Sequence, residues 1–269
     1  AGDPAPAAPV VNVNNQCSAT GSGFTITVTP VTGPLGPYTY GISGATGAFQ
    51  AANTFNVAPG TYTVLVRDVN GCISTGTAVT VAAQLTANAG VTKTLDCTAT
   101  PNAIISGTIN GGRAPFTIEV TSGTGPGTIA QPTANTFTYT TAVASAYTFT
   151  ITDANGCATT ASATVAAITN PTITTNKTDI TCNNANDGTI TVTASGGFTS
   201  AYTYAIKLSS AATYTTQTTN KFTGLSAGTY NVKVIDSKGC ESAVSNVIIS
   251  NPAPIVVNAT VTTPFSCSS

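Results

Sequence analysis

An internal repeat of about 83 residues constrains the fold of this chain more than any other feature of its sequence. Three similar passages end in Gly-Cys, and they read VAPGTYTVLVRDVNGC up to Cys72, AVASAYTFTITDANGC up to Cys157 and LSAGTYNVKVIDSKGC up to Cys240. A second series of cysteines opens the repeats at Cys17, Cys97, Cys182 and Cys267. A fixed period of this kind predicts a tandem array of similar modules.

Each repeat contains short alternating stretches that read as β-strands. Examples from the first repeat are ITVTP, PYTYGI and TAVTVAA. Thr and Val dominate these stretches, and β-branched side chains pack better in strands than in helices. Six or seven short strands with turn residues between them are typical of a β-sandwich. We therefore expect an all-β fold without helices, made of tandem immunoglobulin-like β-sandwich repeats of about 83 residues in an extended rod.

The repeat also predicts where the modules begin and end. The expected modules are residues 1–84, 85–169 and 170–251, followed by residues 252–269 as the start of an incomplete fourth repeat. The passage DPAPAAPVVN at residues 3–12 is similar to NPAPIVVN at residues 251–258. We therefore expect the chain to be a piece of a longer array.

Composition limits the compartment and the partners of the chain. Seven cysteines without accompanying histidine favour an oxidising environment, so we expect an extracellular or cell-surface protein. Charged residues make up only 6% of the chain and the net charge is −1, which disfavours nucleic acid as a partner. The sequence has no run of about 18 apolar residues, so membrane insertion is not expected.

Tyrosines and Asp-Gly passages recur at fixed places in the repeat, and we predict structural roles for both. Tyr62, Tyr147 and Tyr230 each follow a bend and begin a strand, which is typical of a tyrosine corner. Hairpin turns between the last two strands are predicted at Asp68 and Gly71, Asp153 and Gly156, and Asp236 and Gly239. A calcium loop is disfavoured because cysteine stands at its fifth position and no Glu stands at its twelfth. No metal site is expected.

The residues needed for catalysis are almost absent. The chain has no histidine, which excludes Ser-His, Cys-His and His-metal chemistry. Three of its nine acidic residues recur with the repeat and therefore serve the fold. We expect no catalytic residues, no bound cofactor and no enzymatic activity.

Three arrangements of the cysteines are compatible with the repeat. Pairing within a repeat would join Cys17 to Cys72, Cys97 to Cys157 and Cys182 to Cys240. In a sandwich roughly 20 Å long, however, the turn between the first two strands and the turn between the last two lie at opposite ends, whereas bonded cysteines need Cα atoms within about 7 Å. Pairing between successive repeats is therefore favoured, joining Cys17 to Cys157 and Cys97 to Cys240 and leaving Cys72, Cys182 and Cys267 for partners outside the chain. Lateral links between chains are the third arrangement.

The motifs of the repeat resemble those of a known family. In the third unit Cys182 is followed by Asp187-Gly188, Gly196-Gly197 and Gly228-Thr229-Tyr230. This pattern resembles the SprB-type repeat of Bacteroidota gliding and cell-surface adhesins. The first unit lacks the Asp-Gly pair, and the second has Ser145-Ala146 in place of a Gly-containing turn. The resemblance implies a very large surface protein, exported by the type IX secretion system, that bears the repeats as a stalk or adhesive filament.

Three functional hypotheses follow. The first is a structural repeat segment of a secreted adhesin or extracellular filament that acts in attachment, gliding or cell–cell contact, with a tip outside this chain that contacts prey, host or substratum. The alternative is that the repeats themselves bind glycans or another surface. The third is self-association into a multi-chain fibre, because a surface with so few charges and a mean hydropathy of +0.22 favours contact between copies.

Overall fold

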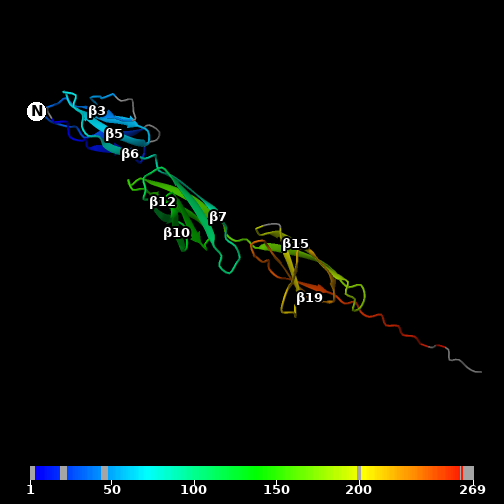
Figure 1. Cartoon of the computed structure of the whole chain (residues 1–269). Helices are drawn as coiled ribbons and strands as arrows, with labels where there is room; N and C mark the ends of the chain where they lie inside the picture. Colours follow the sequence, from blue (N-terminus) through cyan, green and yellow to red (C-terminus); the bar gives the residue numbers. More distant parts are fainter. Residues whose placement is uncertain (1–3, 19–22, 44–47, 199–200, 261, 263–269) are drawn as a thin grey trace, which may run out of the picture. The chain divides into compact units, whose positions relative to one another are not determined.

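The computed structural model describes residues 4–18, 23–43, 48–198, 201–260 and 262 (Figure 1). Every regular element in these residues is a β-strand. The described residues contain no helix that is long and apolar enough to cross a membrane. By internal contacts the chain forms two compact units, one made of Ala1–Leu95 with Asn102–Ala167 and the other of Asp96–Pro101 with Ile168–Ser269.

The first unit begins with a six-stranded module. One sheet contains β1 (Val11–Asn14), β2 (Phe24–Val28) and β4 (Thr54–Val57), in that order. The other contains β3 (Thr39–Ile42), β5 (Gly60–Arg67) and β6 (Thr77–Val81). Side chains from both sheets, among them Phe24, Ile26 and Val64, are fully buried and form one core.

The second module of this unit has seven strands. The first sheet has the order β10 (Gly127–Thr133), β11 (Thr136–Thr141), β8 (Ala103–Asn110) and β7 (Thr86–Lys93). The second has the order β13 (Ala158–Val165), β12 (Ser145–Thr152) and β9 (Thr117–Ser122). Strands one, two, four and five of the module thus form one sheet, and strands three, six and seven form the other. This is the arrangement of the immunoglobulin constant type.

The second unit contains a further seven-stranded module. One sheet consists of β14 (Pro171–Thr178), β15 (Gly188–Gly196) and β18 (Lys221–Leu225). The other has the order β17 (Thr215–Gln217), β16 (Thr203–Leu208), β19 (Gly228–Ile235) and β20 (Ser245–Ile249). The fourth strand of this module, β17, pairs with the third strand, β16, whereas its counterpart β10 pairs with the fifth strand, β11. The same part of the repeat therefore joins opposite sheets in the two modules.

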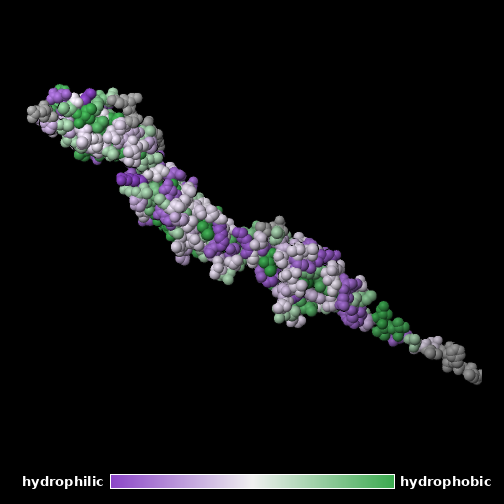
Figure 2. Space-filling view, in the orientation of Figure 1, coloured by the Kyte–Doolittle hydropathy of each residue, from purple (hydrophilic) through white to green (hydrophobic). Residues whose placement is uncertain are grey.

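Alternation along the strands explains both the cores and the surface. In β12, Tyr147, Phe149 and Ile151 are buried, while the Thr residues between them lie on the other face of the sheet. Successive residues of a strand point to opposite faces, so one half of the strand forms the core and the hydroxyl-bearing half faces outward. Most of the surface in Figure 2 is pale, with only small strongly hydrophobic or hydrophilic areas.

The predicted all-β fold of tandem immunoglobulin-like repeats is confirmed. Three separate core clusters lie in β1–β6, β7–β13 and β14–β20. The proposed residue boundaries of the repeats stay predictions, because the two compact units follow contacts and assign residues 96–101 to the second unit.

Candidate functional site: the cysteine-bearing turns

A buried aspartate organises the turn between the last two strands of each module. Its main-chain N–H donates to the carbonyl of the cysteine four residues later. Its main-chain carbonyl accepts the N–H of the glycine three residues later. The aspartates are Asp68, Asp153 and Asp236, at 4%, 6% and 5% exposure, and the glycines are Gly71, Gly156 and Gly239, with φ of +88°, +80° and +77°. Glycine adopts this left-handed conformation without a steric penalty.

The carboxylate closes the turn from inside. Its Oδ1 accepts the N–H of the cysteine, at 2.8 Å for Cys72, 2.9 Å for Cys157 and 3.0 Å for Cys240. The sequence predicts a turn here but not this bond. A signal for it was nevertheless present, because an aspartate stands four residues before the cysteine in all three copies.

The second carboxylate oxygen distinguishes the modules. Asp153 Oδ2 accepts the N–H of Arg113 at 2.9 Å, and Asp236 Oδ2 accepts the N–H of Phe198 at 3.0 Å. The Oδ2 of Asp68 is buried and has no hydrogen-bond partner. In the second and third modules, therefore, the carboxylate also ties the loop before the third strand to the turn.

The surroundings of Asp236 hold the pKa of its carboxyl below the ordinary value. Burial raises the pKa of this carboxyl, but the N–H groups of Phe198, Cys240 and Lys238 and the Lys238 ammonium outweigh it, so the pKa lies below its ordinary 3.8. A carboxyl with a lowered folded-state pKa contributes stability above its unfolded pKa and loses it as the pH falls through the folded value. Urea unfolding of the second unit should therefore show falling stability below about pH 4. The Asp236→Asn variant should have a shallower dependence, and equal slopes would contradict this origin.

The three repeat tyrosines bond to the main chain four residues upstream. The hydroxyl of Tyr62 donates to the Ala58 carbonyl at 2.8 Å, and that of Tyr230 donates to the Ser226 carbonyl at 3.0 Å. The Tyr147 hydroxyl lies 2.9 Å from the carbonyl oxygens of both Val143 and Thr124 and 3.1 Å from Thr141 Oγ1. This is the geometry of a tyrosine corner, and the hydroxyl fixes the bend that precedes the sixth strand of the seven-stranded modules.

Removing the Tyr147 hydroxyl should destabilise the second module more than the equivalent change destabilises the first. Tyr147 is 1% exposed, so Tyr147→Phe leaves buried acceptors without a donor and should cost about 1–2 kcal/mol. The Tyr62 bond is exposed to water, and Tyr62→Phe should cost about 0.5 kcal/mol. Denaturant unfolding of the two variants measures the difference, and equal losses would contradict the role of burial.

The first disulfide joins the first module to the second within one unit. Cys17 lies after β1 and Cys157 lies between β12 and β13, with Cα atoms 4.9 Å apart. Beside it, Gln16 Nε2 donates to the Ala82 carbonyl at 2.7 Å and the Gly112 N–H donates to the Ala83 carbonyl at 2.8 Å. The residues between the two modules are thus held by main-chain and side-chain bonds as well as by the disulfide.

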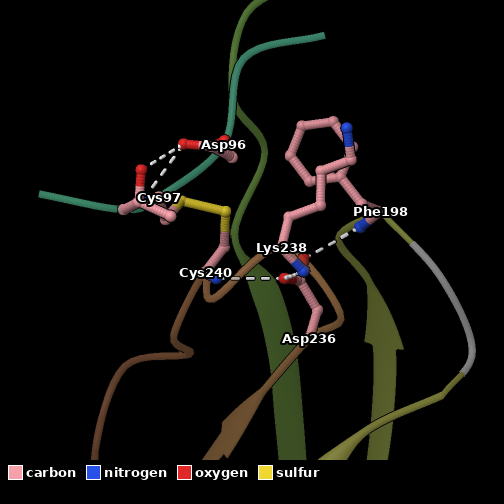
Figure 3. Close-up of a disulfide and its surroundings, with 7 residues drawn as sticks. Asp96, Cys97, Phe198, Asp236, Lys238 and Cys240 are labelled. Atoms are coloured by element: carbon pink, nitrogen blue, oxygen red, sulfur yellow. Dashed lines mark hydrogen bonds between the residues drawn. A yellow bond between two sulfur atoms is a disulfide. The ribbon is translucent and has the colours of Figure 1, made fainter. Parts of the chain in front are cut away.

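The second disulfide lies within the second unit (Figure 3). Cys97 and fully buried Cys240 have Cα atoms 4.9 Å apart, and the Cys97 N–H donates to the Lys238 carbonyl at 3.0 Å. The Lys238 ammonium lies 4.9 Å from the centre of the Phe198 ring, over its face. The strands that flank Cys97, β7 and β8, belong to the other unit, so the short segment Asp96–Pro101 is covalently anchored to the third module.

The remaining cysteines occupy equivalent places in the repeat. Cys72 is half-buried in the turn of the first module and Cys182 is exposed after β14, and neither is bonded to another described cysteine. Cys267 lies outside the described residues. The structure does not join Cys17 to Cys72, Cys97 to Cys157 or Cys182 to Cys240, which was the alternative pairing.

The two disulfides cross along the sequence, and this gives the chain redundant covalent continuity. Cys97 lies inside the loop closed by Cys17 and Cys157, and Cys157 lies inside the loop closed by Cys97 and Cys240. A cut at any one peptide bond between Cys17 and Cys240 therefore leaves all parts connected.

Limited trypsin cleavage tests this continuity. A single cut after Arg113, which lies in an exposed loop, should leave the mass unchanged on a non-reducing gel and split the chain on a reducing one. The same result is expected in the Cys97→Ser/Cys240→Ser variant, because Cys17–Cys157 still spans that cut. Release of a fragment without reductant would contradict the crossed arrangement.

Other chemistry has little support in the described part of the chain. No group of three or more His, Cys, Asp or Glu side chains is placed there to hold a metal ion. The turn aspartates direct their Oδ1 atoms at main-chain N–H groups, so these carboxylates serve as turn acceptors.

Comparisons with known proteins give one family match and several likenesses of fold. The family model described as SprB repeat matches residues 174–210. No curated protein matches the chain. The three N-terminal domains of the bacteriophage RB49 highly immunogenic outer capsid protein are similar at 14% identity and a TM-score of 0.37, over 89% of this chain and 96% of that chain.

Two further solved structures show similar values. The full ectodomain of mouse nectin-like molecule 4 has 12% identity and a TM-score of 0.34, over 88% of this chain and 98% of that chain. A tetra-tandem repeat in the extending region of a large adhesion protein has 18% identity and a TM-score of 0.30, over 90% of this chain and 74% of that chain. Likenesses of this size carry no functional argument.

Proposed function

Since this chain carries an SprB-type repeat at residues 174–210, we propose that it is a structural segment of a large secreted cell-surface protein. In this proposal the modules act as a stalk or filament that presents a tip, outside this chain, to prey, host or substratum. The SprB-type repeat supports the assignment to structural proteins of the cell surface. Attachment, gliding motility, export by the type IX system and an origin in the Bacteroidota follow from the family resemblance and belong to the proposal.

The observation that supports this function is that each disulfide joins cysteines farther apart in the sequence than one predicted repeat. The bonded cysteines are 140 and 143 residues apart, well over one repeat length. Disulfides persist in oxidising compartments outside the cell, which supports a surface location. A bond between repeats opposes their separation when the chain is pulled, whereas a bond inside one sandwich would leave the linkers free. The arrangement suits load bearing, and we propose no enzymatic activity.

Labelling of intact cells of the source organism tests this function. Antibodies raised against the chain should decorate surface filaments in electron micrographs without permeabilisation. Deletion of the gene should reduce attachment or gliding while growth in suspension is unchanged. Labelling that requires cell lysis, or a deletion strain with normal attachment and motility, would refute the proposal.

We also propose that copies of the chain associate laterally into a fibre. Surface of intermediate hydropathy covers much of the view in Figure 2, and bonds such as Thr121 Oγ1 to Thr150 Oγ1 at 3.1 Å satisfy hydroxyls within one sheet. Among the described residues, Val10, Val69 and Ile248 are at least 60% exposed. Light scattering at micromolar concentration should detect particles larger than the 26.7 kDa monomer. A monodisperse monomer would refute this association.

One observation favours the alternative that the modules themselves bind a glycan. The first unit has a hollow of about 790 Å³ lined by Asn12, Gln16, Arg113 and Asn155, among others. Amide and guanidinium groups can hydrogen-bond sugar hydroxyls and carboxylates. A glycan array with the intact chain and with Arg113→Ala tests this candidate. It predicts retention of an acidic saccharide that the variant loses, and the absence of any retained glycan would reject it.

A further inference from the structure

The third strand of each module has one side on which a further strand can pair, and two of the three modules cover that side themselves. In the first module Tyr40 exchanges two main-chain hydrogen bonds with Gln50, at 2.8 and 2.9 Å. In the third module Tyr204 of β16 pairs with Gln217 of β17. Tyr40 and Tyr204 occupy the same place, because each lies opposite the residue two positions before the turn aspartate. The residue at this place in the second module is Ile118 of β9.

The edge of β9 beside Ile118 is open in the described part of the chain. Within those residues β9 pairs with β12 alone, because the fourth strand, β10, pairs with β11 in the other sheet. The main-chain groups of alternate residues in an antiparallel strand point to opposite sides. The groups of Tyr40 that bond to Gln50 point away from β5, so those of Ile118 point away from β12 and toward the open edge. The side chain of Val120, two residues later, is 37% exposed.

The second module cannot cover this edge with its own fourth strand without breaking other contacts. β10 is paired with β11 from Gly127 to Thr133. A Cβ at Gly127 would lie 2.1 Å from the ring of Tyr139, so the main chain there lies directly against that ring. The connection between β9 and β10 is held by the Tyr147 hydroxyl, which donates to the Thr124 carbonyl at 2.9 Å. The edge is therefore available to a strand from outside the module.

A mainly apolar hollow of about 520 Å³ lies at the start of β9. A strand added antiparallel to β9 would direct alternate side chains toward the core side of the sheet, opposite Val120, Ile118 and Phe116. The side chain opposite Phe116 would reach the hollow, whose surface suits an aliphatic group. The lining comes from the loop before β9 and from the turn between β10 and β11, and consists of Ala114, Pro115, Phe116, Gln131, Thr133 and Ala134.

The outer face of β9 carries a negative charge that favours a basic strand. Glu119 is exposed, and within the described residues its carboxylate makes no ion pair or side-chain hydrogen bond. Ala205 stands at its place in the third module, opposite Lys233. The covering segment there supplies Tyr214, whose ring centre lies 4.7 Å from the Lys233 ammonium, so the added strand matches the charge of the sheet. Glu119 lies opposite the neutral Thr150, and the matching side chain on an added strand is a cation.

We propose that the open edge of β9 binds an extended basic peptide segment of a partner protein. The segment adds as an antiparallel strand beside Ile118, places a Lys or Arg side chain next to Glu119 and inserts an aliphatic side chain into the hollow beside Phe116. In strand addition of this kind, main-chain hydrogen bonds supply the affinity and alternate side chains supply the specificity. Charges on exposed edges prevent unspecific pairing, and Glu119 does so while it admits a strand of opposite charge.

Binding of a synthetic peptide to the intact, oxidised chain tests the proposal. The probe is Thr-Val-Lys-Val-Thr-Leu-Thr with blocked ends, in which Lys lies opposite Glu119 and Leu lies opposite Phe116. A second peptide has Glu in place of Lys, and a third has an N-methyl group on the Val opposite Ile118. In a fluorescence titration, the dissociation constant should be at least about fivefold higher for the Glu peptide. It should be at least about tenfold higher for the N-methyl peptide, which has lost a main-chain donor.

Charge reversal at Glu119 provides the matched control. In Glu119→Lys the order should invert, so that the Glu peptide binds at least about fivefold more tightly than the Lys peptide. Glu241→Lys, which reverses an exposed carboxylate of the third module, should leave the order unchanged. The proposal is overturned if the Lys peptide shows no saturable binding, if Glu119→Lys keeps the original order, or if the N-methyl peptide binds equally well.

Hydrogen exchange locates the bound strand. Saturating Lys peptide should slow exchange of the Ile118 amide at least about tenfold, whereas the Tyr204 amide, whose edge β17 already covers, should not change. An unchanged Ile118 amide overturns the proposal. An oligomer of the chain alone that protects Ile118 and excludes the peptide also overturns it, because the edge would then belong to a second copy. The site adds a binding partner to the structural role proposed above, and cell labelling tests that role separately.

Discussion

A single molecule pulled by its two ends is expected to extend to about 370 Å while both disulfides are intact and to about 940 Å after reduction, at roughly 3.5 Å per residue. The load follows the shortest covalent path. This path runs from residue 1 to Cys17, crosses to Cys157, returns along the chain to Cys97, crosses to Cys240 and continues to residue 269. It contains about 105 residues of backbone, and the rest of the chain is shielded from force. Force spectroscopy with and without reductant measures both lengths.

Removal of one disulfide should change the length very little. Without Cys17–Cys157 the shortest path runs through Cys97–Cys240 alone and gives about 440 Å, and without Cys97–Cys240 it gives about 450 Å. The increases in extended length on removing each disulfide are therefore far from additive. Either disulfide alone still lets the load bypass most of the chain. Pairing within repeats would behave differently, since Cys17→Ser would then add about 190 Å. An increase of that size would contradict the crossed arrangement.

The period and the strand content were predictable because each repeat must bury its own core with alternating side chains. Passages such as residues 147–151 place an aromatic or aliphatic residue at every second position, which leaves little freedom of register. The reasoning that favoured bonds between repeats came from the length of a sandwich, and the pairs it favoured are those that the structure joins. The spacing of the cysteines in the sequence, compared with the length of a β-sandwich, was thus enough to predict which turns lie close together.

Features that depend on contacts between segments were not predictable. The fourth strand joins one sheet as β10 and the other as β17, and its residues, GTIAQPT and TTQ, contain little that faces a core in either place. The second oxygen of the turn aspartate binds the N–H of Arg113 or Phe198, which have no side-chain property in common. A main-chain donor has no sequence signature, so neither these bonds nor the unpaired oxygen of Asp68 could be foreseen.

Replacement of the turn aspartate should have opposite consequences in different modules. Asp236→Ala removes the acceptor for the N–H groups of Phe198, Lys238 and Cys240, and we expect the second unit to lose about 3 kcal/mol of unfolding free energy. The disulfide cannot compensate, because it restrains the unfolded chain and leaves the buried donors without partners. Denaturant unfolding of the oxidised protein measures the loss, and a change below about 1 kcal/mol would contradict the role of the carboxylate.

The matched change in the first module is Asp68→Asn. The remaining amide oxygen can still accept the Cys72 N–H, and replacing the charged carboxylate removes a buried ionised oxygen that has no partner. We expect the first module to be unchanged or more stable by up to about 1 kcal/mol. In Asp236→Asn, by contrast, the new NH₂ group faces the Phe198 N–H, donor against donor, and stability should fall by about 2 kcal/mol. Because the substitution is identical, a difference between the two modules reports the surroundings of the second oxygen together with the Lys238 ammonium, which stabilises the charge of Asp236 alone, and equal losses in both modules would contradict an unpaired Asp68 oxygen.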